Sequence, residues 1–448
     1  MRSRLVAGLL VGLTWASVTV STSHAAVPSL STAETGNLLV LLDRGHAKAQ
    51  SASVIERDVL GRSGGRLAGK SVPQIGLVTV RPPAGVSLSA FAARLRRLAD
   101  VTSVEPERRY VPRAVPNDPA LAQASRYSQT TEWALSREGF YNAWNISTGN
   151  GALVGVIDTG IDATHPDLSS KIAATIDEQA PTDSTGPSNT DQNGHGTHVS
   201  SLACAATNNR IGIAGAGYNC KLLVEKTDFT DSSIAAAIVD ATDRHVDSLN
   251  MSFGPANPTP APAPESEVRA LDYAASHKVV LVAAAADEAT TEQGDPSNVL
   301  QPAGSGPTIT SGIGLDVTAA QFGGARASFA GYGSEISVAA YGALDPDQTG
   351  PFGFGPPPGL LGAFPASHTS LEDLPEPCGC RTTFDGSSRY AYLQGTSMAA
   401  PQVAALGAMM RVLNPYATLQ DILTTVKQTA QRPANAGWGQ DLGWGIIN

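Results

Sequence analysis

The stretch Gly395-Thr396-Ser397-Met398-Ala399-Ala400-Pro401 places a serine among small residues, shortly before a proline. Glycine and alanine leave room for another backbone to approach that serine closely. A serine hydroxyl is a weak nucleophile that needs a base in hydrogen-bonding reach, and the base needs a third group to fix its tautomer. Two earlier stretches supply such groups: Val154-Gly155-Val156-Ile157-Asp158-Thr159-Gly160 and Asn193-Gly194-His195-Gly196-Thr197-His198-Val199. The chain therefore offers a candidate nucleophile, base and orienting carboxylate in Ser397, His195 and Asp158.

The C-terminal two thirds of the chain alternates apolar, strand-like runs with helical patterns. The expected strands include 153–157, 221–224, 248–252 and 279–284, and the expected helices include 197–205, 232–242 and 265–276. This alternation predicts an α/β fold, a parallel sheet covered by helices on both faces. Asp158 is then expected at the carboxyl end of a strand, where such sheets bind their ligands. His195 and Ser397 are expected to open helices, whose N-termini favour developing negative charge.

A smaller unit precedes this region. It contains strand-like runs at 37–42 and 75–80, helical patterns at 51–60 and 87–98, and an extended stretch at 101–111. Strands mixed with two helices predict a small α+β domain of ferredoxin-like type. The proline-rich segment 112–119 joins the two units. Within the larger unit, 343–389 is a long stretch rich in glycine and proline, and loops of that length are usually functional or disordered.

The N-terminus predicts a secretory signal peptide over residues 1–25. Arg2 and Arg4 precede an apolar run at 5–20, and Ser23-His24-Ala25 offers small residues for cleavage. A membrane anchor is the alternative, but the apolar run is short and is interrupted by polar residues. The formal net charge of −10 argues against a nucleic-acid partner. We therefore expect a secreted, extracellular protein, or a cell-surface protein if the natural chain continues past Asn448.

The chain has four cysteines, and an even number in an exported protein favours disulfides. Cys204 paired with Cys220 is the first choice among three possible connectivities. It would leave Cys378 and Cys380, separated by one glycine, to pair in a small ring. A zinc site is the alternative, but these spacings do not fit one.

The stretches around Asp158, His195 and Ser397 are similar to the three signatures of the subtilisin-like serine proteases (subtilases, peptidase S8), which carry their triad in this order. Asn117-Asp118-Pro119 resembles the start of a mature enzyme of that family, and Gly443-Trp444-Gly445-Ile446-Ile447-Asn448 resembles its closing motif. The resemblance covers essentially the whole chain. It implies a subtilisin-like sheet flanked by helices on both faces, preceded by a ferredoxin-like prodomain.

The same resemblance implies a division of the chain and a mechanism. The signal peptide spans 1–25, an inhibitory prodomain that assists folding spans 26–113, and the catalytic domain spans 114–448, with 343–389 as an insertion. In the catalytic domain Ser397 attacks the peptide carbonyl, His195 shuttles the proton and Asp158 orients His195. His198 is read as a helix residue that supports the site.

The resemblance also implies where a peptide substrate binds. Residues Ser252-Phe253-Gly254 resemble the strand that pairs with an extended substrate, and residues Ala284-Ala285-Ala286 resemble the opposite wall of the primary pocket. Backbone pairing of this kind is a β-augmentation mode of recognition. The small side chains of the wall leave room for a sizeable substrate residue.

The chain departs from the family at the oxyanion position. The family carries an asparagine after the alanine run, and its amide donates to the oxyanion; here the residue is Asp287. An ionised aspartate cannot donate and would repel the oxyanion, whereas a protonated one can donate. Burial is one way to raise the pKa of a carboxyl enough for that. The backbone N–H of Ser397 and the hydroxyl of Thr396 are the other expected donors.

A structural Ca²⁺ is the cofactor that the resemblance implies, with no organic cofactor. Ca²⁺ prefers six to eight oxygen ligands. The expected side-chain ligands are Asp118, Asp167 and Asn209, and the expected backbone carbonyls belong to Thr207, Ile211 and Ile213. The alternative is a loop that keeps its shape without metal.

The sequence thus predicts a secreted serine endopeptidase that is made as a zymogen, acts on polypeptides, is inhibited by its own prodomain and is monomeric. The prodomain tail is expected at Tyr110-Val111-Pro112-Arg113, with cleavage near Arg113–Ala114. The alternative is a catalytically weakened subtilase that serves as a binding or scaffold protein. An esterase with the same triad is a third possibility, but the chain lacks the G-x-S-x-G elbow around Ser397.

Overall fold

The computed structural model describes residues 34–43, 52–69, 71–108, 115–122, 131–178, 189–255, 262–344, 359–373, 380–432 and 436–448. The predicted signal peptide, the predicted prodomain tail at 110–113 and Cys378 lie outside these residues.

The N-terminal unit contains the strands and helices predicted from the sequence, in the predicted order, together with a short strand and a 3₁₀ turn that were not predicted. Its elements are β1 (Glu34–Leu42), α2 (Ala52–Ser63), β2 (Arg66–Leu67), the 3₁₀ turn η1 (Pro73–Ile75), β3 (Leu77–Arg81), α3 (Leu88–Leu95) and β4 (Val101–Arg108). The sheet order is β2-β3-β1-β4, with antiparallel neighbours throughout. This β-α-β-β-α-β arrangement is the ferredoxin-like topology. Its core packs β1 and β3 against the two helices through residues such as Val40, Val78 and Phe91.

The larger unit is built on a seven-stranded sheet whose paired neighbours are all parallel. In chain order its described strands are β5 (Leu153–Asp158), β6 (Ile172–Asp177), β7 (Lys221–Lys226), β8 (Ser248–Met251), β9 (Val280–Ala284), β10 (Gly314–Gln321) and β11 (Val338–Ala343). Their order across the sheet is β11-β10-β9-β8-β5-β7-β6. The strand order reverses at β5, which places the switch point of this α/β sheet beside the end of that strand.

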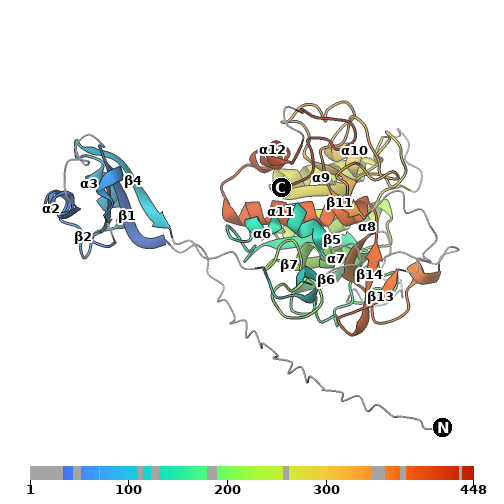
Figure 1. Ribbon diagram of the computed structural model, residues 1–448. Coiled ribbons are helices and arrows are strands. Elements are labelled where there is room, and N and C mark those ends of the chain that lie inside the picture. The colour runs from blue at the N-terminus through green and yellow to red at the C-terminus, as the bar shows by residue number, and fades with distance from the viewer. Residues whose placement is uncertain are drawn as a thin grey trace, which may run out of the picture. The chain divides into compact units, whose positions relative to one another are not determined.

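Helices cover both faces of this sheet, as the sequence predicted (Figure 1). One face packs against α7 (His195–Cys204), α11 (Thr396–Leu413) and α12 (Leu419–Thr429). The other packs against α8 (Asp231–Asp243), α9 (Glu265–Ser276) and α10 (Ser297–Leu300). Three further short helices are α4 (Pro119–Ala122), α5 (Trp133–Arg137) and α6 (Phe140–Ala143). Because both faces are covered, a strand can be buried along its whole length, and β9 is apolar and buried at every position.

The glycine- and proline-rich insertion is more regular than a long loop. It contributes β12 (Leu360–Ala363), the 3₁₀ turn η2 (Ser370–Asp373), β13 (Arg381–Phe384) and β14 (Ser387–Leu393), which form an antiparallel sheet in the order β12-β14-β13. Asp385 and Gly386 connect β13 to β14 with φ values of 49° and 75°. A two-residue Asp-Gly loop with both φ angles positive is the type I′ hairpin signal, and composition alone hides it.

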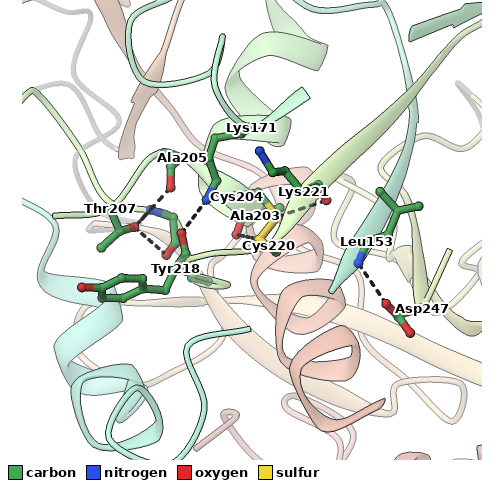
Figure 2. The surroundings of a disulfide bond; sticks show 12 residues. Leu153, Lys171, Ala203, Cys204, Ala205, Thr207, Tyr218, Cys220, Lys221 and Asp247 are labelled. Atoms are coloured by element: carbon green, nitrogen blue, oxygen red, sulfur yellow. Dashed lines mark hydrogen bonds between the residues drawn. A yellow bond between two sulfur atoms is a disulfide. The ribbon is translucent and has the colours of Figure 1, made fainter. Parts of the chain in front are cut away.

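The predicted disulfide between Cys204 and Cys220 is confirmed (Figure 2). It joins the last residue of α7 to the residue just before β7. Nearby, Lys171 Nζ donates to the carbonyl of Tyr218 at 2.7 Å, which holds the approach to the same strand. Cys380 is also disulfide-bonded, and Cys378, its predicted partner, lies outside the described residues. Among the described residues, no helix is both long enough and apolar enough for a membrane crossing.

Candidate active site

Three elements of the large unit present the residues that the sequence selected as a triad. Asp158 is the last residue of β5, His195 is the first of α7, and Ser397 is the second of α11. His195 Nδ1 lies 2.8 Å from Asp158 Oδ1 and 3.0 Å from Asp158 Oδ2. A carboxylate only accepts, so Nδ1 carries the proton and Nε2 is the basic nitrogen. Asp158 is buried, whereas the His195 side chain is 23% exposed.

The electrostatic setting of His195 favours its charged form. Burial acts to lower the pKa of His195, but the charge and hydrogen bond of Asp158, with the charges of Asp191 and Asp287, outweigh it and leave the pKa raised. An imidazolium that forms during a reaction is therefore stabilised in place.

Asp191 organises this pair, although sequence reasoning did not select it. Its Oδ1 accepts from the hydroxyl of Thr159 at 2.9 Å and from the N–H of Gly194 at 2.8 Å. Its Oδ2 accepts from the N–H and the hydroxyl of Thr197 at 2.9 and 2.6 Å. Asp191 therefore ties the residue after Asp158 to the first turn of α7, which carries His195. An aspartate three residues before a helix-opening glycine is the signal that could have identified it.

Ser397 is held by reciprocal hydrogen bonds with Ser252. Ser397 Oγ donates to the carbonyl of Ser252 at 3.3 Å, and Ser252 Oγ donates to the carbonyl of Ser397 at 3.1 Å. Pro401 explains the second bond, because it lacks the N–H that would otherwise bond the carbonyl of Ser397 within α11. Within the described residues, no hydrogen bond joins Ser397 to His195. Such contacts are often long in unliganded enzymes and tighten when substrate binds.

Asp287 contacts the residue before Ser397. Its Oδ1 accepts from the backbone N–H of Thr396 at 2.8 Å and lies 2.9 Å from the Thr396 hydroxyl. The residue as a whole is exposed to solvent. Desolvation by the protein around its carboxylate nevertheless raises the pKa of Asp287, although the two Thr396 hydrogen bonds and the charge of His195 oppose the rise. A protonated Asp287 is thus favoured relative to an ordinary aspartate.

The hydroxyl of Thr396, the other predicted oxyanion donor, has internal partners. It donates to the carbonyl of Ala285 at 2.6 Å and lies 2.9 Å from Asp287 Oδ1. A hydroxyl has one proton to donate, so donation to an oxyanion would require Thr396 to give up these contacts. The oxyanion role of Thr396 stays a prediction.

The two predicted substrate-binding segments differ in how free their backbones are. Among the described residues, nothing pairs with the backbone of Phe253 or Gly254, which follow β8. By contrast, the carbonyls of Ala284, Ala285 and Ala286 all accept internal hydrogen bonds. The first segment can therefore pair with an extended peptide, and the second can contribute only a wall of small side chains.

Two carboxylates of the predicted calcium loop each hold that loop by hydrogen bonds. Asp118 accepts from the N–H groups of Asn208 and Asn209 at 2.8 and 3.1 Å. Asp167 accepts from Asn209 Nδ2 at 2.9 Å and from the hydroxyl of Tyr390, on β14, at 2.8 Å. Burial raises the pKa of Asp118 to about 6 and also raises that of Asp167.

The three predicted carbonyl ligands remain free in this loop. Within the described residues, no donor contacts the carbonyls of Thr207, Ile211 or Ile213. Buried carboxylates with raised pKa values beside unpaired carbonyls form an oxygen-rich set that fits Ca²⁺.

The other histidines near the site have structural partners. His198 Nε2 lies 3.1 Å from the carbonyl of Leu360 and 3.2 Å from that of Ala391, which belong to β12 and β14. Burial lowers the pKa of His198 to about 3, so its ring stays neutral. His165 Nε2 lies 2.8 Å from the carbonyl of Arg389. Both rings therefore hold the insertion against the core of the catalytic unit.

Comparisons with known proteins agree with this fold. Residues 149–445 match the subtilase family, peptidase S8. A thermostable alkaline protease of Halalkalibacterium halodurans is 32% identical over 309 residues, covering 68% of this chain and 69% of the relative. An extracellular protease of Xanthomonas campestris pv. campestris is 28% identical over 446 residues, covering 90% and 68% respectively.

A solved structure described as proteases from Pseudoalteromonas arctica aligns with a TM-score of 0.58 and 26% identity, covering 75% of this chain and 97% of that one. This chain belongs to the subtilase family and is a serine endopeptidase.

Proposed function

We propose that this serine endopeptidase is secreted as a zymogen and cleaves polypeptides through Ser397, His195 and Asp158. The observation that carries the proposal is the hydrogen-bonded pair of His195 and Asp158 at the end of β5, with Ser397 in the first turn of α11. The signatures around these residues and the similarity to proteases support it. The relatives, which are described as proteases, do not favour the scaffold alternative.

In the proposed mechanism each group has its own step. Ser397 Oγ attacks the substrate carbonyl carbon while its proton passes to His195 Nε2. Asp158 keeps the proton of His195 on Nδ1 and stabilises the imidazolium. His195 then gives its proton to the leaving amine, and water releases the acyl group from Ser397 by the same route. The N–H of Ser397 and a protonated Asp287 are the proposed donors to the oxyanion.

A fluorophosphonate probe tests the nucleophile. After removal of the N-terminal unit, the probe should label wild type at Ser397, and Ser397→Ala should remain unlabelled. His195→Ala should label far more slowly, because the base is lost. A mature wild-type protein that is folded but not labelled at Ser397 would instead favour the binding or scaffold function.

The N-terminal unit is the proposed inhibitory prodomain. Its ferredoxin-like topology supports this role, as does its place before the segment that resembles a mature N-terminus. N-terminal sequencing of wild type and of Ser397→Ala would locate the cleavage, which we expect near Arg113–Ala114. Normal processing of Ser397→Ala would show that another protease makes the cut.

The loop around Asn209 is the proposed structural calcium site. Asp118, Asp167 and the Asn209 side chain would hold Ca²⁺ with the carbonyls of Thr207, Ile211 and Ile213. When bound, the ion neutralises the buried carboxylates and fixes the loop that follows α7. Protection against heat by Ca²⁺ that is lost in Asp167→Ala would support the site, and a melting temperature unchanged by chelator would count against it.

Secretion is proposed from the predicted signal peptide and from the extracellular relative. The disulfide between Cys204 and Cys220 agrees with an oxidising compartment. Expression with and without residues 1–25, followed by assay of medium and cells, tests the localisation.

A further inference from the structure

Three carboxylates converge at one edge of the seven-stranded sheet, apart from the proposed triad and calcium loop. Glu178 follows the edge strand β6, Glu225 lies on β7, and Asp240 lies on α8. One carboxylate oxygen from each of the three lies within 4.8 Å of the others. A single cation could therefore contact all three side chains.

Glu225 is buried in an apolar setting. In the register of the sheet it lies beside Ile157 of β5 and Ile176 of β6, which belong to the hydrophobic cluster under α8. The residue has no exposed surface, and neither carboxylate oxygen has a hydrogen-bond partner among the described residues. An ionised carboxylate buried without a partner costs several kcal/mol. Glu225, pointing into the cluster, therefore requires a proton or a cation.

The charge count favours a divalent cation. Arg244 forms an ion pair with Asp240 one helical turn away. When all three carboxylates are ionised, one guanidinium leaves two negative charges uncompensated. Without an ion, burial, followed by the charges of Asp240 and Glu178 and a hydrogen bond that protonated Glu225 can make with Asp240, raises the pKa of Glu225 to about 9, so a bound cation has to displace a proton from this cluster.

The cluster is also accessible and has suitable donors. Glu178 and Asp240 are half-exposed, so an ion can enter from solvent and keep water ligands. All three donors are carboxylate oxygens, which suit hard divalent cations such as Ca²⁺ and Mn²⁺.

We propose that Glu178, Glu225 and Asp240 bind one hard divalent cation, with Ca²⁺ as the first candidate, at a site separate from the loop of Asp118 and Asp167. The ion would fasten α8 to the edge of the sheet formed by β6 and β7. The proposal does not depend on the catalytic role of Ser397.

Ion binding to the full chain tests the proposal, with Ser397→Ala used throughout to prevent self-cleavage. Calorimetric titration with CaCl₂, followed by elemental analysis after removal of excess ion, gives affinity and stoichiometry. Glu225→Gln should lose one bound Ca²⁺ per chain or weaken one site tenfold or more. Asp240→Asn should act in the same way and serves as the second variant if Glu225→Gln does not fold. Asp243→Asn, on the same helix but outside the cluster, should bind like the parent.

Arg244→Gln tests the charge argument directly, because it removes a positive charge without removing a proposed ligand. Removing the competing guanidinium should tighten this site, whereas unchanged or weaker binding would contradict the charge argument. Unchanged stoichiometry together with unchanged affinity in both Glu225→Gln and Asp240→Asn would overturn the proposal. Greater stability of Glu225→Gln in chelator, with stoichiometry and affinity both unchanged, would show that a shared proton replaces the ion. Asp167→Ala separates the two sites, because it should remove only the ion of the calcium loop.

Discussion

The carboxylate of Asp287 accepts the backbone N–H of Thr396 at 2.8 Å, one residue before the proposed nucleophile. Asp287 therefore anchors the start of α11, and by its resemblance to the family it is also proposed to stand at the position of the oxyanion donor. An ionised carboxylate accepts the N–H of Thr396 well, but it repels a developing oxyanion. Asparagine could perform both, because its carbonyl oxygen can accept from Thr396 while its amide donates to the oxyanion.

We therefore expect Asp287→Asn to raise kcat at neutral pH. Loss of one oxyanion donor costs about 10²- to 10³-fold in kcat, as in subtilisin, and that range is the upper limit of the gain. Steady-state kinetics on a peptide library measures it. Asp287→Ala is the matched control, because it removes the negative charge without supplying a donor or an anchor. No change or a loss of kcat in Asp287→Asn would contradict the protonated-donor proposal.

The pH profile gives a second prediction. His195 acts as a base only when deprotonated, so activity should rise as pH increases through its raised pKa. Asp287 donates only when protonated, so activity should fall as pH increases through the pKa of Asp287, which is also raised. A bell-shaped profile of kcat/KM is expected. Asp287→Asn should keep the acidic limb of the profile but lose the fall in activity at alkaline pH that Asp287 causes. If the activity of this variant still falls at alkaline pH, another group is responsible for that fall.

The pairing of Asp158 with His195 predicts a large effect of Asp158→Asn. Asparagine would favour the wrong tautomer of His195, and such a change costs about 10⁴-fold in kcat. Asp162→Asn is the control, because Asp162 pairs with Arg389 at 2.7 Å rather than with His195. Fluorophosphonate labelling rates and peptide kinetics compare the two variants, and equal losses would argue against a special role for Asp158.

The calcium loop predicts a pH-dependent stability. Burial raises the pKa of Asp118 to about 6 from its ordinary value of 3.8. Without metal, the native state therefore keeps a proton that the unfolded chain has released, so the free energy of unfolding should fall as pH rises from about 4 to about 6. This difference corresponds to about 3 kcal/mol. Added Ca²⁺ needs the ionised carboxylates and should protect more at pH 7 than at pH 5. Melting curves of Ser397→Ala with Ca²⁺ or chelator at both pH values test this.

The disulfide gives a prediction about stability alone. Cys204 and Cys220 are separated by 16 residues in the sequence. In the chain-entropy description, a loop of about this length stabilises by about 3 kcal/mol. The double variant Cys204→Ala/Cys220→Ala should lose about that much free energy of unfolding, measured by urea titration in the Ser397→Ala background. The same stability with and without the bond would indicate that packing between α7 and β7 suffices.

The sequence predicted those parts of the fold that follow from local patterns. The apolar run of β9 predicted a strand because that strand is buried on both faces, and the periodicity of α9 predicted a helix because only one side of that helix is buried. The hairpin of β13 and β14 was not predicted, although Asp385-Gly386 is a turn signal, because the surrounding composition suggested a loop. Packing between distant segments, such as the contact of Tyr390 with Asp167, has no signal in a single sequence.

The candidate site, like the fold, was predicted from the sequence only in part. Motifs placed Asp158 and His195 at element ends, where the structure joins them. The supporting role of Asp191 and the crossed bonds between Ser252 and Ser397 depend on three-dimensional geometry. The effect of Asp287 could be raised as a question from the sequence, but its contact with Thr396 required the structure.

The insertion sheet has a consequence for protein engineering. It is attached to the catalytic core at separate points, by Tyr390 to Asp167, by Arg389 to Asp162, and by His198 to the carbonyls of β12 and β14. Grafting this segment from another subtilase, or trimming it to a short connection, would therefore alter loops that lie far from it in the sequence. A transplant should succeed only if it carries these attachments with it, together with the contact of His165 with Arg389, so the segment is not an interchangeable module.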